Sequence, residues 1–299
     1  MKRASLTQFA WISIVAALLT IGLKTAAWRV TGSVGLLSDA MESIVNLFGG
    51  VMALAMLTVA ARPADEDHPY GHGKAEYFSS GVEGGLIVVA ALSIGYTAIE
   101  RLITPRPLEG ISLGLGISIL ASLVNLGVAL LLLRVGKKHE SITLEANARH
   151  LLTDVWTSVG VVIGVGMVAL TGWTQLDAIV AMLVATNIVW TGVGIVRKSI
   201  YGLMDTALPE PDLIKVDRVL ESHRQIPVQF HALWTRQAGS RKFVSLHVLV
   251  PGDWTVQRGH TLLEEIENDI RKALPGAIVF THLESLEDPA SWEDATLDR

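Results

Sequence analysis

Six long apolar runs fill the sequence up to residue 196 and restrict what this chain can fold into. Each has roughly the 20 residues that a helix needs to cross a bilayer. Half of the 299 residues are hydrophobic, which is too apolar for an ordinary soluble protein of this length. The sequence therefore predicts a membrane protein whose helices occupy residues 9–28, 34–61, 78–99, 111–135, 144–170 and 176–196.

The basic residues indicate how the helices are oriented. By the positive-inside rule, the side with more Lys and Arg is cytoplasmic. The N-terminus is basic before an apolar run, but no clear small-residue cleavage site follows, so we interpret this run as a retained span. We expect a multi-pass protein of the inner (cytoplasmic) membrane with both termini in the cytoplasm. The cytoplasmic set is Lys2, Arg3, Arg62, Lys74, Arg134, Lys137, Lys138, Arg197 and Lys198, against Lys24, Arg29, Arg101 and Arg106.

After residue 205 the sequence becomes polar and periodic, with no run long enough to span a membrane. Apolar residues recur at helical spacing in 212–224 and 255–274, and they alternate as in strands in 228–236, 242–250 and 277–284. This order, αββαβ, predicts a small two-layer α+β domain whose sheet edges and exposed face favour dimerisation. The expected domains are 1–205 for transport, 206–290 for regulation and dimerisation, and 291–299 as a tail.

Composition limits the chemistry that is available. The chain has no cysteine, so a metal site must use His, Asp, Glu and other oxygen or nitrogen donors, and nine histidines are present. The net charge of −5 and the lack of a basic tract or base-stacking motif argue against nucleic acid as a partner.

Two pairs of polar residues lie inside the apolar runs, where each carries a free-energy cost. His150 and Asp154 are four residues apart, and so are Glu42 and Asn46, so each pair shares one helical face. Two such helices facing each other would offer four donors for a divalent metal. Local pairing of His150 with Asp154, and packing through Asn46, are the structural alternatives.

Other candidate ligands lie outside the spans. Asp65, His68 and His72 follow one another in a glycine-containing loop, which could also be an ordinary solvated turn. In the cytosolic domain His282 and Glu284 share a strand face, since residues i and i+2 point the same way. A neighbouring strand could add further ligands, although a single surface histidine usually has no such role. The full cytosolic set is His231, His247, His260, His282 and Glu284.

Together these motifs resemble the cation diffusion facilitator family, which includes bacterial zinc and iron exporters. The resemblance extends over nearly the whole chain. Its motifs are Ser38-Asp39-Ala40, the His68-x-x-Gly-His-Gly-Lys-Ala-Glu76 loop, His150-x-x-x-Asp154, Leu203-Met-Asp205 and Thr235-Arg-Gln237.

The resemblance implies a homodimeric antiporter that exports a divalent metal in exchange for protons by alternating access. It also implies a ferredoxin-like, metallochaperone-like cytosolic domain that responds to metal. By residue, it assigns Glu42, Asn46, His150 and Asp154 to transport, and the loop and cytosolic sets above to further metal sites. Lys74 and Asp205 match residues that the family pairs in a salt bridge between its two domains.

Glu42 and Asn46 depart from the zinc exporters of the family, which usually carry Asp or His, then Asp, at these positions. Asn46 is neutral and a weaker donor, so this site has two carboxylates where a common zinc site often has three. Glu284 replaces a more common Asp. Zn²⁺ is the expected substrate and regulatory ligand, with Co²⁺, Fe²⁺, Cd²⁺ and Mn²⁺ left open.

Three other functions fit parts of the sequence. A passive divalent-metal channel could use the same ligands as a filter, although tight chelation would slow the release of ions. A metal-sensing membrane receptor would use the histidine-rich cytosolic domain alone. A membrane metalloenzyme lacks a recognisable nucleophile or general base, so we do not expect an enzyme. Two small-residue faces, Gly81-x-x-x-Gly85 and Gly160-x-x-x-Gly164, predict close helix packing within one chain or between two.

Overall fold

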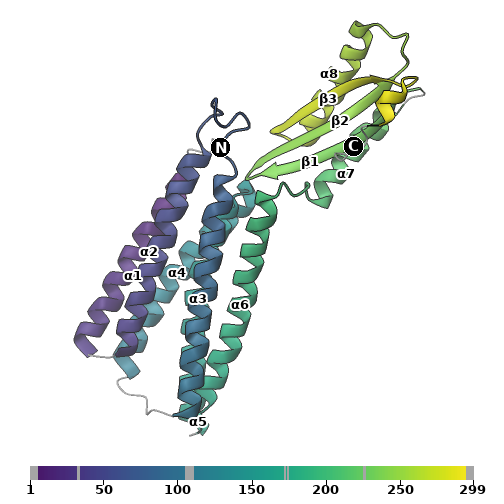
Figure 1. Ribbon diagram of the computed structural model, residues 1–299. Helices are drawn as coiled ribbons and strands as arrows, with labels where there is room; N and C mark the ends of the chain where they lie inside the picture. The colour runs from purple at the N-terminus through teal and green to yellow at the C-terminus, as the bar shows by residue number, and fades with distance from the viewer. Residues whose placement is uncertain are drawn as a thin grey trace. The chain divides into compact units, whose positions relative to one another are not determined.

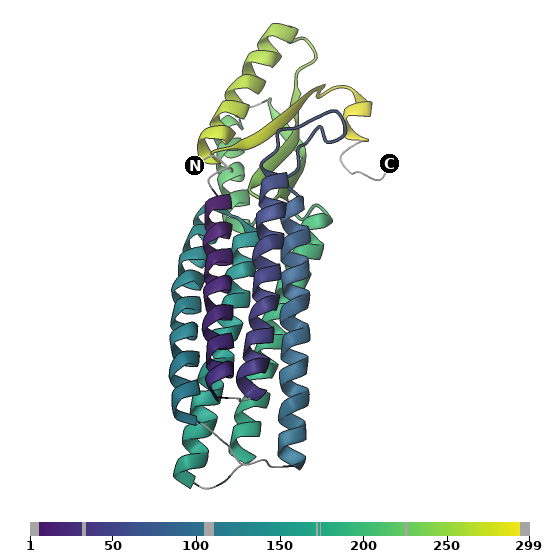
Figure 2. The same cartoon turned by 90° about the vertical axis from the view of Figure 1, so that its left-hand side faces the viewer.

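Six long helices form the first of two compact units, Met1–Tyr201. The computed structural model describes residues 6–31, 34–104, 111–171, 173, 175–224 and 227–293. For some residues within the helices, including Glu42 and Asn46, it describes the backbone but not the side chain. Figures 1 and 2 show these helices alongside one another as a bundle. They are α1 (Thr7–Thr31), α2 (Val34–Ala60), α3 (Ala75–Ile103), α4 (Ile111–His139), α5 (Ile142–Thr171) and α6 (Gln175–Leu203).

The outer surface of the bundle is apolar, as a membrane domain requires. Among the described residues, four helices are long and apolar enough to cross a membrane: α1, α3, α4 and α6. Large apolar side chains point outward from them, with Trp190 82% and Val89 64% exposed. Outside a membrane such a surface would drive aggregation, so these faces are suited to lipid. The expected fold class, a helical membrane domain followed by an α+β domain, is confirmed.

Two glycines allow α3 and α6 to approach closely. A Cβ atom built on Gly84 would lie 3.1 Å from the backbone oxygen of Gly192, and one built on Gly192 would lie 3.1 Å from that of Gly84. The predicted small-residue faces join this contact only in part, through Gly81, where an added Cβ atom would lie 3.6 Å from Cβ of Ser199 on α6. A Cβ on Gly85 would meet nothing within 4 Å, one on Gly160 would lie 3.1 Å from Val184, and the side-chain surroundings of Gly164 are outside the description.

The second unit, Gly202–Arg299, contains the α+β domain. Its elements are α7 (Glu210–His223), β1 (Gln229–Ala238), β2 (Arg241–Val250), α8 (Val256–Ala273), β3 (Ala277–Ser285) and a 3-10 helix (Pro289–Trp292). The strands lie in the order β1-β2-β3, with β1 antiparallel and β3 parallel to β2. The predicted αββαβ order is confirmed, and Figure 1 shows α7, α8 and the three strands.

The sheet of this domain has two different faces. Val244, Leu246 and Val248 alternate along β2, are fully buried, and belong to the core that includes Val216 of α7 and Ile266 of α8. Residues between them point to the opposite face, because strand side chains alternate. That face carries the histidines, and the parallel register brings His247 beside His282.

A β-bulge in β1 changes which residues reach that face. The register shifts between His231 and Trp234, and Ala232 has a positive φ of 49°, which is uncommon for a residue other than glycine. His231 and Trp234 would point to opposite faces of a regular strand. Both rings nevertheless lie next to His247, at centroid distances of 5.1 and 5.5 Å. The bulge therefore brings a third histidine and a tryptophan to the same face.

Candidate metal sites

The candidate transport site lies on α5, where His150 and Asp154 are 4% and 5% exposed. Residues four apart share a helical face, so the two side chains can reach one ligand. Neither ring nitrogen of His150 has a hydrogen-bond partner among the described residues. A buried imidazole without partners is costly unless it binds something, and a divalent metal fits a neutral imidazole beside a carboxylate.

Asn125 on α4 extends this site, and our sequence reasoning missed it. Its Nδ2 donates a hydrogen bond of 3.2 Å to Oδ2 of Asp154, and Asn125 is only 1% exposed. The contact orients the carboxylate that shares a face with His150. The sequence contains a signal for Asn125, because a polar side chain inside an apolar run carries a free-energy cost that calls for a function. The same criterion also identifies Glu83 on α3.

Glu42 and Asn46 were predicted to complete the transport site. Both residues fall within α2, and α2 contacts α5, as a site shared by the two helices requires. Their side chains lie outside the described residues. Their part in the site therefore stays a prediction.

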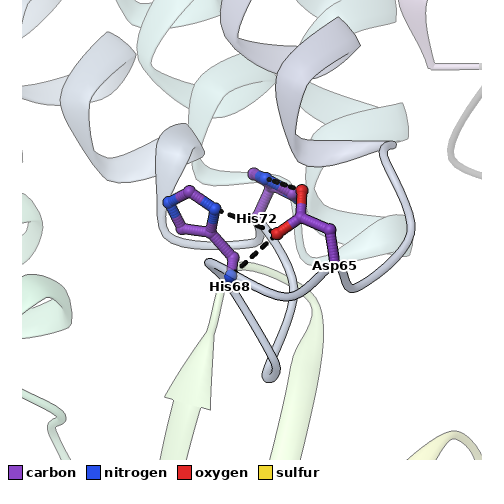
Figure 3. A group of neighbouring side chains, drawn as sticks. All are labelled: Asp65, His68 and His72. Atoms are coloured by element: carbon purple, nitrogen blue, oxygen red, sulfur yellow. Dashed lines mark hydrogen bonds and ion pairs between the residues drawn. The ribbon is translucent and has the colours of Figure 1, made fainter.

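The loop between α2 and α3 brings Asp65, His68 and His72 together (Figure 3). Oδ1 of Asp65 lies 3.2 Å from Nδ1 of His68, and Oδ2 lies 3.2 Å from Nε2 of His72. The two imidazole rings are 4.4 Å apart. The turn is closed by a hydrogen bond of 2.8 Å from the backbone N–H of Gly71 to the carbonyl of His68, and Gly71 has the positive φ of 79° that favours glycine.

One further contact and the pKa of Asp65 suit this loop to a cation. Nδ1 of His72 lies 3.2 Å from the carbonyl oxygen of Pro63. A carbonyl can only accept, so Nδ1 carries the proton and Nε2 of the neutral ring presents a lone pair beside Asp65, as in many metal-ligating histidines. Desolvation raises the pKa of Asp65, but hydrogen bonds from His68 and the nearby imidazoles outweigh it and lower that pKa below its usual value.

The second described cluster consists of His231, His247 and Glu284 on the open face of the sheet. Both rings face Glu284: its Oε2 lies within hydrogen-bond distance of Nε2 of His231, at 2.8 Å, and its Oε1 lies 3.3 Å from Nδ1 of His247. The Glu284 side chain is only 7% exposed. Two imidazoles that converge on a buried carboxylate are a donor set typical of zinc sites.

The two remaining cytosolic candidates occupy different places. Nε2 of His282 lies 3.6 Å from Oε1 of Glu284, and its ring is 5.0 Å from that of His247, so it borders the cluster and is more exposed. His260 is exposed on α8 and is not among the ligand groups that converge in the described structure. A role for either histidine stays a prediction.

Lys74 and Asp205 belong to different units, so the predicted pair stays a prediction. Within its own unit, Asp205 accepts a hydrogen bond of 3.1 Å from Nη1 of Arg236 on β1. Asp205 has a positive φ of 56° just after α6 ends. This contact ties the start of the second unit to its sheet.

A helical bundle with a buried imidazole and carboxylate is followed by an α+β domain with a histidine–carboxylate cluster. These features define a membrane protein with candidate cation sites in both domains. Two family models match the chain: the cation efflux transmembrane domain over residues 10–204 and the cation efflux protein cytoplasmic domain over residues 208–286. The chain belongs to this cation-efflux family, also called the cation diffusion facilitators, whose members export divalent metals. Like the other members of this family of transporters, it is a multi-pass membrane protein.

Relatives match along almost the whole chain. An uncharacterized transporter of Synechocystis sp. is 53% identical over 285 residues, covering 95% of this chain and 92% of its own. The cation-efflux pump FieF of Salmonella schwarzengrund is 28% identical over 290 residues, covering 97% and 94%. A solved structure described as that of a candidate zinc transporter, CzrB, aligns with 26% of this chain and 96% of its own, with 32% identity and a TM-score of 0.25.

Proposed function

We propose that this protein exports a divalent transition metal, Zn²⁺ first among the candidates, from the cytoplasm in exchange for protons by alternating access. The observation that carries the proposal is the buried pair on α5. His150 keeps both ring nitrogens without a hydrogen-bond partner among the described residues, one helical turn from the carboxylate of Asp154. Relatives named cation-efflux pumps match 97% of the chain and support export as the direction.

The ligand set is built from borderline and hard donors. His150, Asp154, Glu42 and Asn46 would supply one imidazole, two carboxylates and one amide oxygen, and the chain has no cysteine to select softer ions. Such a set accepts Zn²⁺ and also suits Co²⁺, Fe²⁺, Cd²⁺ or Mn²⁺. Asn46 cannot ionise, so the residue at this position is expected to tune which of these metals is carried.

Proton coupling follows from the same ligands. A metal ion needs a neutral imidazole and ionised carboxylates, so metal and protons compete for one site. Imidazole ordinarily titrates near pH ~6.5, which suits His150 to carry the proton. Metal leaves on the outer side as protons enter, and the protonated site returns to the inner side.

The other sites would regulate transport. A metal bound by His231, His247 and Glu284 stabilises one arrangement of the cytosolic domains and thereby biases the membrane domain. His282 and His260 could add ligands to this site, and Asp65, His68 and His72 would bind a cation at the cytoplasmic loop. The assembly is a homodimer in the inner membrane with both termini in the cytoplasm, and Lys74 and Asp205 link its membrane and cytosolic domains.

Metal uptake by purified protein in proteoliposomes tests the proposal. The wild type should accumulate Zn²⁺ against its concentration gradient only when a proton gradient is imposed, and the uptake of each ion should be matched by proton release. Asp154→Ala should abolish uptake, and His150→Ala should remove the coupled proton release. Uptake that is indifferent to the proton gradient would favour the passive channel, and unchanged uptake by Asp154→Ala would refute the site.

A further inference from the structure

Glu83 on α3 is a carboxylate that the four proposed ligands do not include. It is 0% exposed within the bundle, and its Oε2 has no hydrogen-bond partner among the described residues. Its other oxygen, Oε1, accepts a hydrogen bond of 3.4 Å from Ser79 Oγ, one turn earlier on the same helix. A carboxyl group buried this deeply in a membrane domain is costly, so it needs a ligand or a function.

The register of α3 against α5 places Glu83 at the depth of His150. Ser141 Oγ donates a hydrogen bond of 2.6 Å to Oε2 of Glu76, and Thr143 Oγ1 donates one of 3.1 Å to the carbonyl of Glu76. Glu76 and Thr143 are each the second residue of their helix, so the two helices start level. Glu83 and His150 follow these two residues by the same interval of seven positions.

Seven residues make almost two helical turns, with a rise of about 10 Å. Glu83 therefore lies over nearly the same face of α3 as Glu76, and His150 over nearly the same face of α5 as Thr143. Glu76 and Thr143 meet where α3 packs against α5. Glu83 and His150 therefore also face this helix–helix contact, about two turns further along α3 and α5.

The helix α2 completes this arrangement. A Cβ atom built on Gly49 would lie 3.8 Å from Cγ of Glu83, so Glu83 also packs against α2. Gly49 follows Asn46 by three residues, and positions three apart are neighbours on a helix surface. The helices α2, α3 and α5 contact one another, and Glu83 lies where the helix of Glu42 and Asn46 meets the helix of His150 and Asp154.

We infer that Glu83 supplies a further carboxylate to the transported metal, offsetting the charge that Asn46 lacks. This inference rests on the proposed function and deepens it, since Glu83 would then help to set which metal is carried. With Glu83 the site offers three carboxylates and one imidazole, enough negative charge for a divalent cation in a medium of low dielectric constant. The unpartnered Oε2 is the atom available for the metal.

Transport kinetics across a metal panel test the inference. Wild type, Glu83→Gln, Glu83→Asp and the matched control Glu100→Gln, an exposed position on the same helix, are compared in proteoliposomes with Zn²⁺, Co²⁺ and Mn²⁺. Glu83→Gln should raise KM about tenfold or more, the scale of lost metal-site contacts. It should also change the ranking of the metals, which a purely structural role would not do. Glu83→Asp should keep part of the affinity, and Glu100→Gln should match the wild type.

A second variant distinguishes a lost metal ligand from a general packing defect. Asn46→Asp restores a carboxylate on α2, so adding it to Glu83→Gln should recover most of the lost affinity. An unchanged KM for every metal in Glu83→Gln overturns the inference while leaving the proposed function intact. A double variant that stays as impaired as Glu83→Gln also overturns it. If the wild type moves no metal at all, the proposed function and the inference fail together.

Discussion

The amide nitrogen of Asn125 lies 3.2 Å from a carboxylate oxygen of Asp154, and this contact joins α4 to the proposed transport site. Asn125 contacts one of the four proposed ligands and is not itself among them, so we expect it to act by orienting the carboxylate of Asp154. Asn125→Ala should lower metal affinity by about 10-fold to 100-fold, the usual effect of removing such a partner. The measurement is KM for Zn²⁺ uptake. Asn187→Ala, the same change at an exposed position of α6, is the control and should leave KM unchanged.

The loop site predicts a bound ion that depends on Asp65. Asp65→Ala should reduce the Zn²⁺ bound per chain by one in equilibrium dialysis, because the carboxylate that lies between His68 and His72 is lost. Asp67→Ala, an exposed carboxylate in the same loop, should bind as the wild type does. Equal stoichiometry in all three proteins would exclude the loop as a metal site.

The same site should lose its metal as the pH falls. The pKa of Asp65 is lowered, so its carboxylate stays ionised through the mildly acidic range. Imidazole side chains ordinarily protonate near pH ~6.5, and protonated rings cannot bind a metal. Zn²⁺ affinity at the loop should therefore be highest above neutrality and decline below about pH 6. Equilibrium dialysis at several pH values measures this affinity, after the Zn²⁺ bound by Asp65→Ala is subtracted from that bound by the wild type. A Zn²⁺ affinity that is constant from pH 8 to pH 5 would contradict the assignment.

Two tryptophans should report metal at the cytosolic cluster. The Trp292 ring is 5.8 Å from His231, and the Trp234 ring is 5.5 Å from His247. Zn²⁺ binding should change their fluorescence, and Trp292→Phe should remove part of that signal. His231→Ala should weaken the response about tenfold or more. His260→Ala tests whether His260 belongs to the site. An unchanged Zn²⁺ titration would limit the site to the cluster of His231, His247 and Glu284, and a weakened one would show that His260 contributes.

The contact between Gly84 and Gly192 predicts an asymmetry along α3. Gly84→Leu should destabilise the bundle, since even a Cβ atom at this position would lie 2.9 Å from a methyl carbon of Val196. Gly85→Leu should be tolerated, because a Cβ there would meet nothing within 4 Å. The yield of monodisperse protein in detergent distinguishes the two variants. Comparable yields would mean that α3 and α6 do not pack in this way.

Asp212 predicts how the cytosolic domain responds to acid. It accepts hydrogen bonds from Lys215 of α7 and Lys242 of β2, at 2.8 and 2.7 Å. Desolvation raises its pKa, but the bonds and charges of the two lysines outweigh it and lower that pKa below the usual value. A lowered pKa contributes stability that is present above the unfolded value of about 3.9 and is lost as the pH falls through the folded pKa.

Asp212→Asn should therefore destabilise α7 and β2 by roughly 1 to 3 kcal/mol at neutral pH, the range for an unpaired buried partner. The difference from the wild type should shrink below about pH 4. Hydrogen exchange of these two elements in the full chain, corrected for intrinsic rates, measures the effect. Asp217→Asn, an exposed carboxylate on the same helix, should exchange as the wild type does at every pH.

The sequence by itself determined the elements and most of the candidate ligands. Run length and periodicity depend only on local order, so the predicted elements of the cytosolic domain end within two residues of the observed ones. The i, i+4 spacing of His150 and Asp154, and the i, i+2 spacing of His282 and Glu284, are likewise local properties of a helix and a strand.

Only the tertiary structure decided which distant residues meet. The bulge at Ala232 brings His231 and Trp234 to one face, against the regular alternation of a strand. The packing of α4 on α5 brings Asn125 to Asp154, and the level starts of α3 and α5 place Glu83 at the depth of His150. A sequence pattern states which side of an element a residue occupies, but contacts between elements depend on register and packing, which no local pattern encodes.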